Sequence, residues 1–142
     1  MAKKLDLVNI GAAGTFVARG AVTVAGIRRD IPFPLDVVIR PAAEVLRLVD
    51  AGPPKATGAQ VYVSVLVAKP KLSPRLPLDV PERAWALRIV ERRGPFVVWL
   101  RRVDARPGLD MSAVEKAFGA RATTRGWPTF ERIAKAIRAL ER

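Results

Sequence analysis

The sequence predicts an α+β protein: a single compact, basic domain over residues 1–142, with a mixed sheet of five or six strands packed by helices, one of which ends the chain. Two observations predict this class. Short stretches rich in β-branched residues alternate with turn signals, and several other stretches carry apolar residues at helical spacing. Half of the residues are apolar and the length is that of one ordinary domain, so the chain can bury a hydrophobic core.

The first forty residues mix strand signals with turns. We expect two short strands, Leu5–Ile10 and Gly14–Ala18, on either side of a glycine-containing turn. The next stretch, Gly20–Arg29, fits either a strand or a helix that ends before Pro32. A run of β-branched residues then predicts a strand at Leu35–Arg40.

A helix and the clearest strand of the chain follow. Pro41 suits the beginning of a helix, and Ala42–Asp50 continues with apolar residues at helical spacing until Gly52. In Gln60–Ala68 every second residue from 61 to 67 is valine, and the opposite face is also largely apolar, so we expect an inner strand covered on both sides. Four prolines make Lys69–Pro81 a surface connection rather than a strand.

A β-hairpin is predicted from Trp85–Glu91 and Phe96–Val103. The register that sets Glu91 opposite Phe96 brings aliphatic residues of both strands together on one face, as a core requires. On the other face, the same register sets Arg88 beside Trp99.

Two helices end the chain. The first runs from Asp110 to about Phe118, and Gly119 follows as the residue that most readily adopts a left-handed end conformation. The second begins at Trp127, with Pro128 at the first helical position and a buried apolar stripe down to Leu140.

Composition narrows the functional classes. With 25 Lys and Arg against 13 Asp and Glu, the net charge of +12 favours polyanionic partners, although a coding bias or a hot habitat could also explain the many arginines. The chain has no Cys and no His, which excludes disulfides, thiolate chemistry and the commonest general base. The sequence has no signal peptide and no apolar run that would span a membrane, so we expect a cytoplasmic protein with no membrane partner.

Catalytic motifs are missing as well. The chain contains neither a P-loop nor a Rossmann glycine pattern, and no pair of carboxylates is spaced for acid–base work. Gly11–Gly14 matches the Gly-x-x-Gly loop of KH nucleic-acid-binding domains, but it joins two predicted strands and carries no basic residue, so we interpret it as a simple turn. We therefore expect a non-enzymatic protein with no catalytic residue, no metal site and no cofactor.

The leading hypothesis is a protein that binds DNA or RNA through phosphates. A base could stack on the indole of Trp99 while the guanidinium of Arg88 binds a phosphate. The alternatives are a purely structural cation–π pair and a tryptophan buried under a helix. The candidate nucleic-acid-binding residues are Arg88, Arg92, Arg93, Trp99, Arg101 and Arg102.

The stretch 119–130, Gly-Ala-Arg-Ala-Thr-Thr-Arg-Gly-Trp-Pro-Thr-Phe, resembles the closing motif of an uncharacterised bacterial family, the domain of unknown function 1697. That motif is Thr-x-Arg-Asn-Trp-x-Thr-Val before a terminal helix. Gly126 and Phe130 differ from it, and the family's amino-terminal Arg-Gly-Ile-Asn-Val-Gly-Gly segment is missing from this chain. The resemblance implies a compact α+β fold and no established activity. The matching residues are Thr123, Arg125, Trp127 and Thr129.

Two further hypotheses remain open. A sheet edge exposed by the missing segment could pair with a second copy, which would make the protein a protein-interaction or homodimerisation module. Alternatively, Arg121, Arg125 and Trp127 precede the last helix, whose free N–H groups favour anions, so that the protein would be an enzyme acting on a small phosphate ligand. A structural explanation of the same residues is that Trp127 fastens the helix to the core and Arg125 pairs with an acid or caps carbonyls.

Overall fold

The computed structural model describes residues 7–9, 15–18, 38–104 and 111–141. The chain divides into two compact units. One unit is Gly52–Trp127, and the other combines Met1–Ala51 with Pro128–Arg142.

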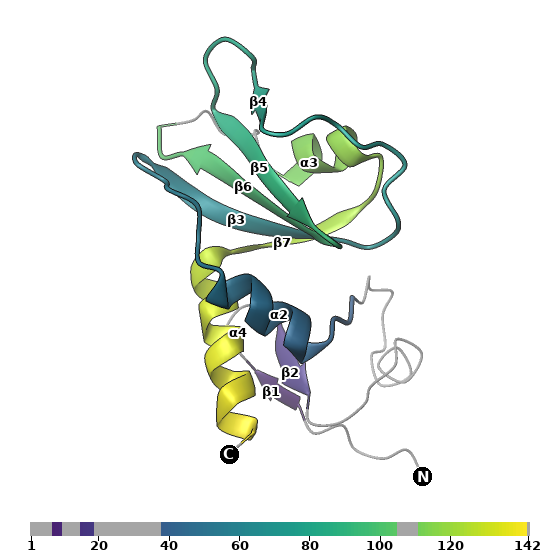
Figure 1. Cartoon of the computed structure of the whole chain (residues 1–142), viewed down its shortest axis with the longest axis vertical. Helices are drawn as coiled ribbons and strands as arrows, with labels where there is room; N and C mark the ends of the chain where they lie inside the picture. The colour runs from purple at the N-terminus through teal and green to yellow at the C-terminus, as the bar shows by residue number, and fades with distance from the viewer. Residues whose placement is uncertain (1–6, 10–14, 19–37, 105–110, 142) are drawn as a thin grey trace. The chain divides into compact units, whose positions relative to one another are not determined.

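The unit Gly52–Trp127 is built on an antiparallel sheet and one helix, α3 (Met111–Phe118) (Figure 1). The predicted α+β class is confirmed, and the sheet has five strands whose pairings are all antiparallel rather than mixed. In spatial order the strands are β4 (Leu78–Val80), β5 (Leu87–Arg93), β6 (Phe96–Arg102), β3 (Ala59–Leu66) and β7 (Ala122–Gly126).

The core of this unit forms between α3 and one face of the sheet. Val114 and Phe118 lie four residues apart and therefore on the same side of α3. They cluster with Leu87 and Ile89 of β5 and with Trp99 of β6, and each of these five side chains is at most 2% exposed. This face of the sheet is thus closed by the helix.

Strand β3 is the inner strand that its composition predicts. It pairs with β6 on one side and with β7 on the other. Side chains of successive residues point to opposite faces of a strand, and the four residues from Val63 to Leu66 are all buried. Both faces of β3 are therefore covered, as expected.

The β5–β6 hairpin has a tighter turn than predicted. The turn contains two residues, Gly94 and Pro95, and Gly94 takes a φ of +56°, which glycine adopts most easily. Arg93 consequently lies opposite Phe96, where we expected Glu91. The predicted register was wrong because the residues around Gly94 are equally compatible with a longer turn.

A β-bulge in β5 then decides which residues of β5 lie on the same face of the sheet as Trp99. The pairing skips Val90, so that Ile89 lies opposite Trp99 on the core face. Arg88 lies opposite Leu100 instead, and its side chain points to the other face of the sheet. The predicted pair of Arg88 and Trp99 is therefore wrong.

Two strands were not predicted. Strand β4 lies in the proline-rich stretch that we expected to be a surface connection, and Pro77 and Pro81 flank it instead of interrupting it. Strand β7 lies inside the stretch 119–130, whose small and polar residues show no clear alternation. Pairing with a neighbouring strand, rather than local pattern, makes both segments strands.

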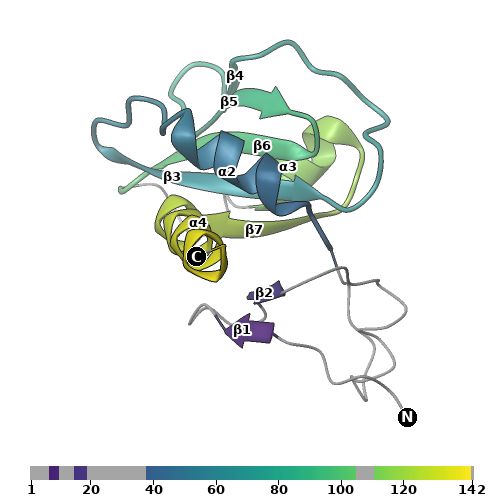
Figure 2. The ribbon, with the colours of Figure 1, turned by 60° about the horizontal axis from the view of Figure 1, so that its bottom comes forward.

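The second unit contains the hairpin of β1 (Leu7–Asn9) and β2 (Phe16–Ala18), which pair antiparallel (Figure 2), together with helix α2 (Ala42–Asp50). It also contains helix α4 (Trp127–Leu140) from Pro128 onward. These elements match the predicted ones.

Both helices of this unit are amphipathic. Val45 and Leu48 are the buried residues of α2, and the buried stripe of α4 follows the predicted spacing. An ion pair joins Asp50 at the end of α2 to Arg138 of α4. Of the predicted strand Leu35–Arg40, residues 38–40 are not in a strand, and the remainder lies outside the described residues. Gly11–Gly14 and Gly20–Arg29 also lie outside them.

Candidate nucleic-acid interface

The arginines predicted to bind nucleic acid do not gather on one surface. Arg92 and Arg93 lie at the turn of the β5–β6 hairpin, whereas Arg101 and Arg102 end strand β6, about 20 Å away along the strand. Arg93 also forms an ion pair of 2.8 Å with Glu91. Arg101 and Arg102 are neighbours in a strand and so point to opposite faces of the sheet.

Trp99 is a core residue and not a stacking platform. Its side chain is 2% exposed, and its ring stacks on Tyr62 with centroids 4.7 Å apart and an interplanar angle of 20°. Its indole Nε1 donates a hydrogen bond of 2.8 Å to Ser64 Oγ, which shares a 2.6 Å hydrogen bond with Thr124 Oγ1. The alternative of a buried tryptophan is the one that the structure contains, because Trp99 packs in the core with Val114 and Phe118 of α3.

A different tryptophan lies against the arginines. The half-buried ring of Trp85, two residues before β5, has the Cζ of Arg88 at 4.3 Å from its centroid and the Cζ of Arg102 at 4.1 Å. Both distances are within the range of a cation–π interaction. We call these three residues the Trp85 cluster.

The pairing of β5 with β6 positions this cluster. Arg102 N donates to Ala86 O at 2.8 Å, which sets Arg102 opposite a residue two positions before Arg88. The two arginine side chains therefore lie on the same face of the sheet, on neighbouring strands. Trp85 immediately precedes Ala86, so its ring can reach both guanidinium groups.

The two arginines of the cluster differ in their partners. Arg88 donates from Nε and Nη2 to the two carboxylate oxygens of Asp79, at 2.6 and 3.1 Å. The hydrogen bond from Arg88, with smaller contributions from the charges of Arg88 and Arg102, holds the pKa of Asp79 below its ordinary value of 3.8. The hydrogen bond to Asp79 in turn raises the pKa of Arg88. Asp79 thus compensates the charge of Arg88.

Arg102 is exposed and has a different environment. Its Nε donates a 2.6 Å hydrogen bond to the carbonyl oxygen of Trp85. Within the described part of the chain, its two terminal nitrogens have no hydrogen-bond acceptor and no ion-pair partner. Arg102 therefore presents a positioned guanidinium whose outer nitrogens can bind an anion.

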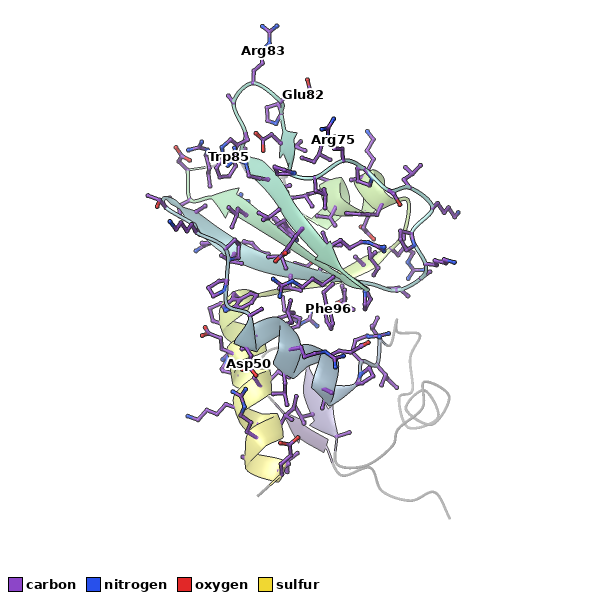
Figure 3. All side chains as sticks on the ribbon, in the orientation of Figure 1. Asp50, Arg75, Glu82, Arg83, Trp85 and Phe96 are labelled. Carbon is purple, nitrogen blue, oxygen red and sulfur yellow. The ribbon has the colours of Figure 1, made fainter. Side chains whose placement is uncertain are left out.

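The loop between β4 and β5 lies next to the cluster in the chain. Its exposed residues Glu82 and Arg83 extend away from the sheet, while Trp85 lies close to the beginning of β5 (Figure 3). The whole unit Gly52–Trp127 contains 14 Lys and Arg against six Asp and Glu, a net charge of +8. The cluster is thus part of a strongly basic unit.

The residues predicted to bind a small anion lie at the two ends of β7. Arg121 precedes the strand, while Arg125 and Trp127 lie at its other end, so the three do not form one site. Trp127 is buried. Arg125 Nη1 donates to Thr124 O at 2.7 Å and to Thr123 Oγ1 at 3.2 Å. The first of these bonds caps a carbonyl, as the structural explanation of Arg125 predicts.

The sequence does not indicate Trp85 as a functional residue. It predicts Trp85 as part of a hairpin strand, whereas β5 begins only at Leu87. The available signal was a tryptophan at the beginning of a strand whose hairpin partner ends in Arg101-Arg102.

Across the described ranges, no group of three or more acidic residues is arranged to hold a metal ion. In the same ranges, none of the helices combines the length and the apolar character that crossing a membrane requires.

Comparisons of this chain with protein-family models, with curated proteins and with solved structures found no match. The resemblance to the domain of unknown function 1697 therefore stays a prediction.

Proposed function

We propose that this protein is a non-enzymatic nucleic-acid-binding protein that contacts phosphates through the Trp85 cluster, with Arg102 as the main contact. The observation that supports this proposal is the geometry of Arg102. Its guanidinium is held over the Trp85 ring and by one hydrogen bond from Nε, while its outer nitrogens remain directed to no acceptor among the described residues. An arginine held in this way loses less conformational entropy on binding a phosphate than a freely moving one.

The cluster favours contact with phosphates over stacking with bases. Two guanidinium groups lie within 4.3 Å of the centroid of one half-buried ring, so little of the ring is left for a base. Phosphate contacts carry no sequence information. We therefore expect similar affinities for unrelated sequences and for DNA and RNA, and an affinity that falls steeply with salt.

The charge of the surrounding unit supports the same partner. A net charge of +8 on a unit of this size attracts a polyanion over roughly a Debye length, about 8 Å at physiological salt. Asp79 competes with a phosphate for Arg88, so we assign Arg88 a secondary contribution.

The test compares two single arginine variants. Arg102→Ala removes the proposed contact, and Arg92→Ala removes an equal charge from an exposed arginine at the distant hairpin turn. Binding of labelled single-stranded DNA, duplex DNA and RNA would be measured over a salt series, beside an unrelated protein of similar net charge. We expect Arg102→Ala to lower affinity by about tenfold. The slope of log affinity against log salt concentration should become shallower by the amount that corresponds to about one phosphate contact. Arg92→Ala should have a much smaller effect.

Different results of this experiment would contradict the proposed site and the proposed function. Equal losses in both variants would mean that charge alone attracts the nucleic acid and that the Trp85 cluster is not the site. Wild-type binding no tighter than that of the basic control protein would refute the proposed function itself. Arg102→Lys, which keeps the charge but not the planar group, should have an intermediate affinity.

A further inference from the structure

Strand β7 is an edge of the five-stranded sheet. It is hydrogen-bonded to β3 on one side, and no described strand lies on its other side. An edge strand presents N–H and C=O groups that can pair with a strand of another chain, and proteins commonly block such edges.

The hydrogen bonds show which groups of β7 face the open edge. Val67 N donates to Arg121 O at 2.8 Å, so Arg121 turns its backbone toward β3. Every second residue of the strand does the same, because the pairing is antiparallel. The residues between them, which include Ala122 and Thr124, turn their N–H and C=O groups toward the open edge.

Two of these outward groups already form hydrogen bonds with charged side chains of the same chain. Glu115 of α3 accepts the N–H of Ala122 with its Oε2 at 3.0 Å. Arg125 donates from Nη1 to the carbonyl oxygen of Thr124 at 2.7 Å. One outward donor and one outward acceptor are therefore satisfied within the same chain. A pairing strand would have to displace a carboxylate and a guanidinium that are both half-buried.

We propose that Glu115 and Arg125 close the edge of β7 against pairing with a second copy of this chain. A second copy is the relevant partner because a two-fold axis beside β7 brings identical edges together, and each edge supplies both donors and acceptors. The homodimerisation hypothesis would then require a surface other than this edge. The proposal is independent of nucleic-acid binding, because neither residue belongs to the Trp85 cluster.

The opposite edge of the sheet, strand β4, is a poor site for pairing with a second copy. Strand β4 has three residues, and Pro77 and Pro81, which flank it, have no N–H to donate. It is a short edge with few groups to offer, so an increase in association after opening β7 would not be expected to come from β4.

The experiment removes both closing side chains. The variant Glu115→Ala/Arg125→Ala would be compared with wild type and with Glu82→Ala/Arg83→Ala, which removes one acid and one base from the exposed β4–β5 loop. Sedimentation equilibrium over a range of protein concentrations measures the average mass. We expect the mass of the edge variant to rise toward two chains at concentrations where wild type and the loop variant keep their lower mass.

Amide hydrogen exchange by NMR locates the change. In dilute Glu115→Ala, the amide of Ala122 should exchange about tenfold faster than in wild type, because it has lost its acceptor. In the associated edge variant, the amide of Thr124 should become protected. A folded edge variant with the mass of wild type at every concentration overturns the proposal, as does association without protection in β7. If the double variant does not fold, Arg125→Ala alone must show the same mass increase, and its failure to do so overturns the proposal equally.

Discussion

Trp99 of β6 donates its indole N–H to the hydroxyl of Ser64 on the neighbouring strand β3, at 2.8 Å and in the interior of the protein. Ser64 is completely buried, and its hydroxyl is also within 2.6 Å of Thr124 Oγ1 on β7. A buried tryptophan needs an acceptor for its N–H, and this serine supplies it. The hydroxyl thus links three adjacent strands of the sheet.

This link predicts a specific loss of stability. Ser64→Ala should lower the free energy of unfolding by about 1–3 kcal/mol, because it leaves the Trp99 N–H without its acceptor in the core. Urea unfolding measures the change. Ser73→Ala, at an exposed serine in the β3–β4 connection, should change the same free energy by no more than about 0.5 kcal/mol. Equal stability of Ser64→Ala and wild type would show that the hydrogen bond contributes little.

Removing the acid of the Trp85 cluster should strengthen nucleic-acid binding. Asp79→Asn leaves Arg88 beside Trp85 without its carboxylate partner, so that a second guanidinium can donate hydrogen bonds to a phosphate. We expect affinity to rise several-fold in the same binding assay. Glu131→Gln, an equal charge change at an exposed residue of α4, is the control. An equal rise in both variants would mean that only net charge matters.

The ion pair of Asp79 and Arg88 predicts a pH dependence of stability. Because hydrogen bonding to Arg88 holds the pKa of Asp79 below 3.8 in the folded protein, the unfolded chain binds this proton more tightly. The pair therefore stabilises the fold above the unfolded pKa, and this contribution is lost as the pH falls through the folded pKa. Urea unfolding from pH 7 to 2 should show wild type losing stability more steeply than Asp79→Asn below about pH 4. Parallel profiles would contradict the assignment.

Two glycines at turns should differ in their tolerance of a side chain. Gly119 ends α3 at a φ of +62°, and a Cβ there would lie 3.1 Å from the Cβ of Lys71. Gly94 has a similar φ of +56°, but a Cβ there would meet nothing within 4 Å. Gly94→Ala should lower the free energy of unfolding by about 1 kcal/mol through backbone strain, and Gly119→Ala by clearly more. Thermal or urea unfolding of the two variants measures the difference. Because the two φ values are similar, the difference would come from the contact between the new Cβ at position 119 and Lys71.

Much of the fold could be predicted because its signals are local. The apolar spacing of α2 and α4 repeats within each helix, Pro128 lies at the beginning of α4, and Gly119 follows the last residue of α3. The valines of β3 alternate within one strand, and the apolar character of its other face predicted the burial on both sides that the structure contains.

The candidate site could not be predicted in the same way. The register between β5 and β6 decides which arginines lie beside a tryptophan. The two-residue turn at Gly94 and the bulge at Val90 together determine this register. A shift of one residue moves a side chain to the opposite face. Trp99 therefore lies on the opposite face from the one predicted, and Trp85 is the tryptophan beside the arginines.

The sequence by itself determined the basic charge, the amphipathic helices and the inner strand, because each of these depends on residues that are close together in the chain. Only the tertiary structure decided that β4 and β7 are strands, that Trp99 is in the core and Trp85 beside Arg88 and Arg102, and that Arg125 caps a carbonyl of its own strand. Strand pairing joins residues far apart in sequence, and the free energy that selects one register comes from packing over the whole sheet.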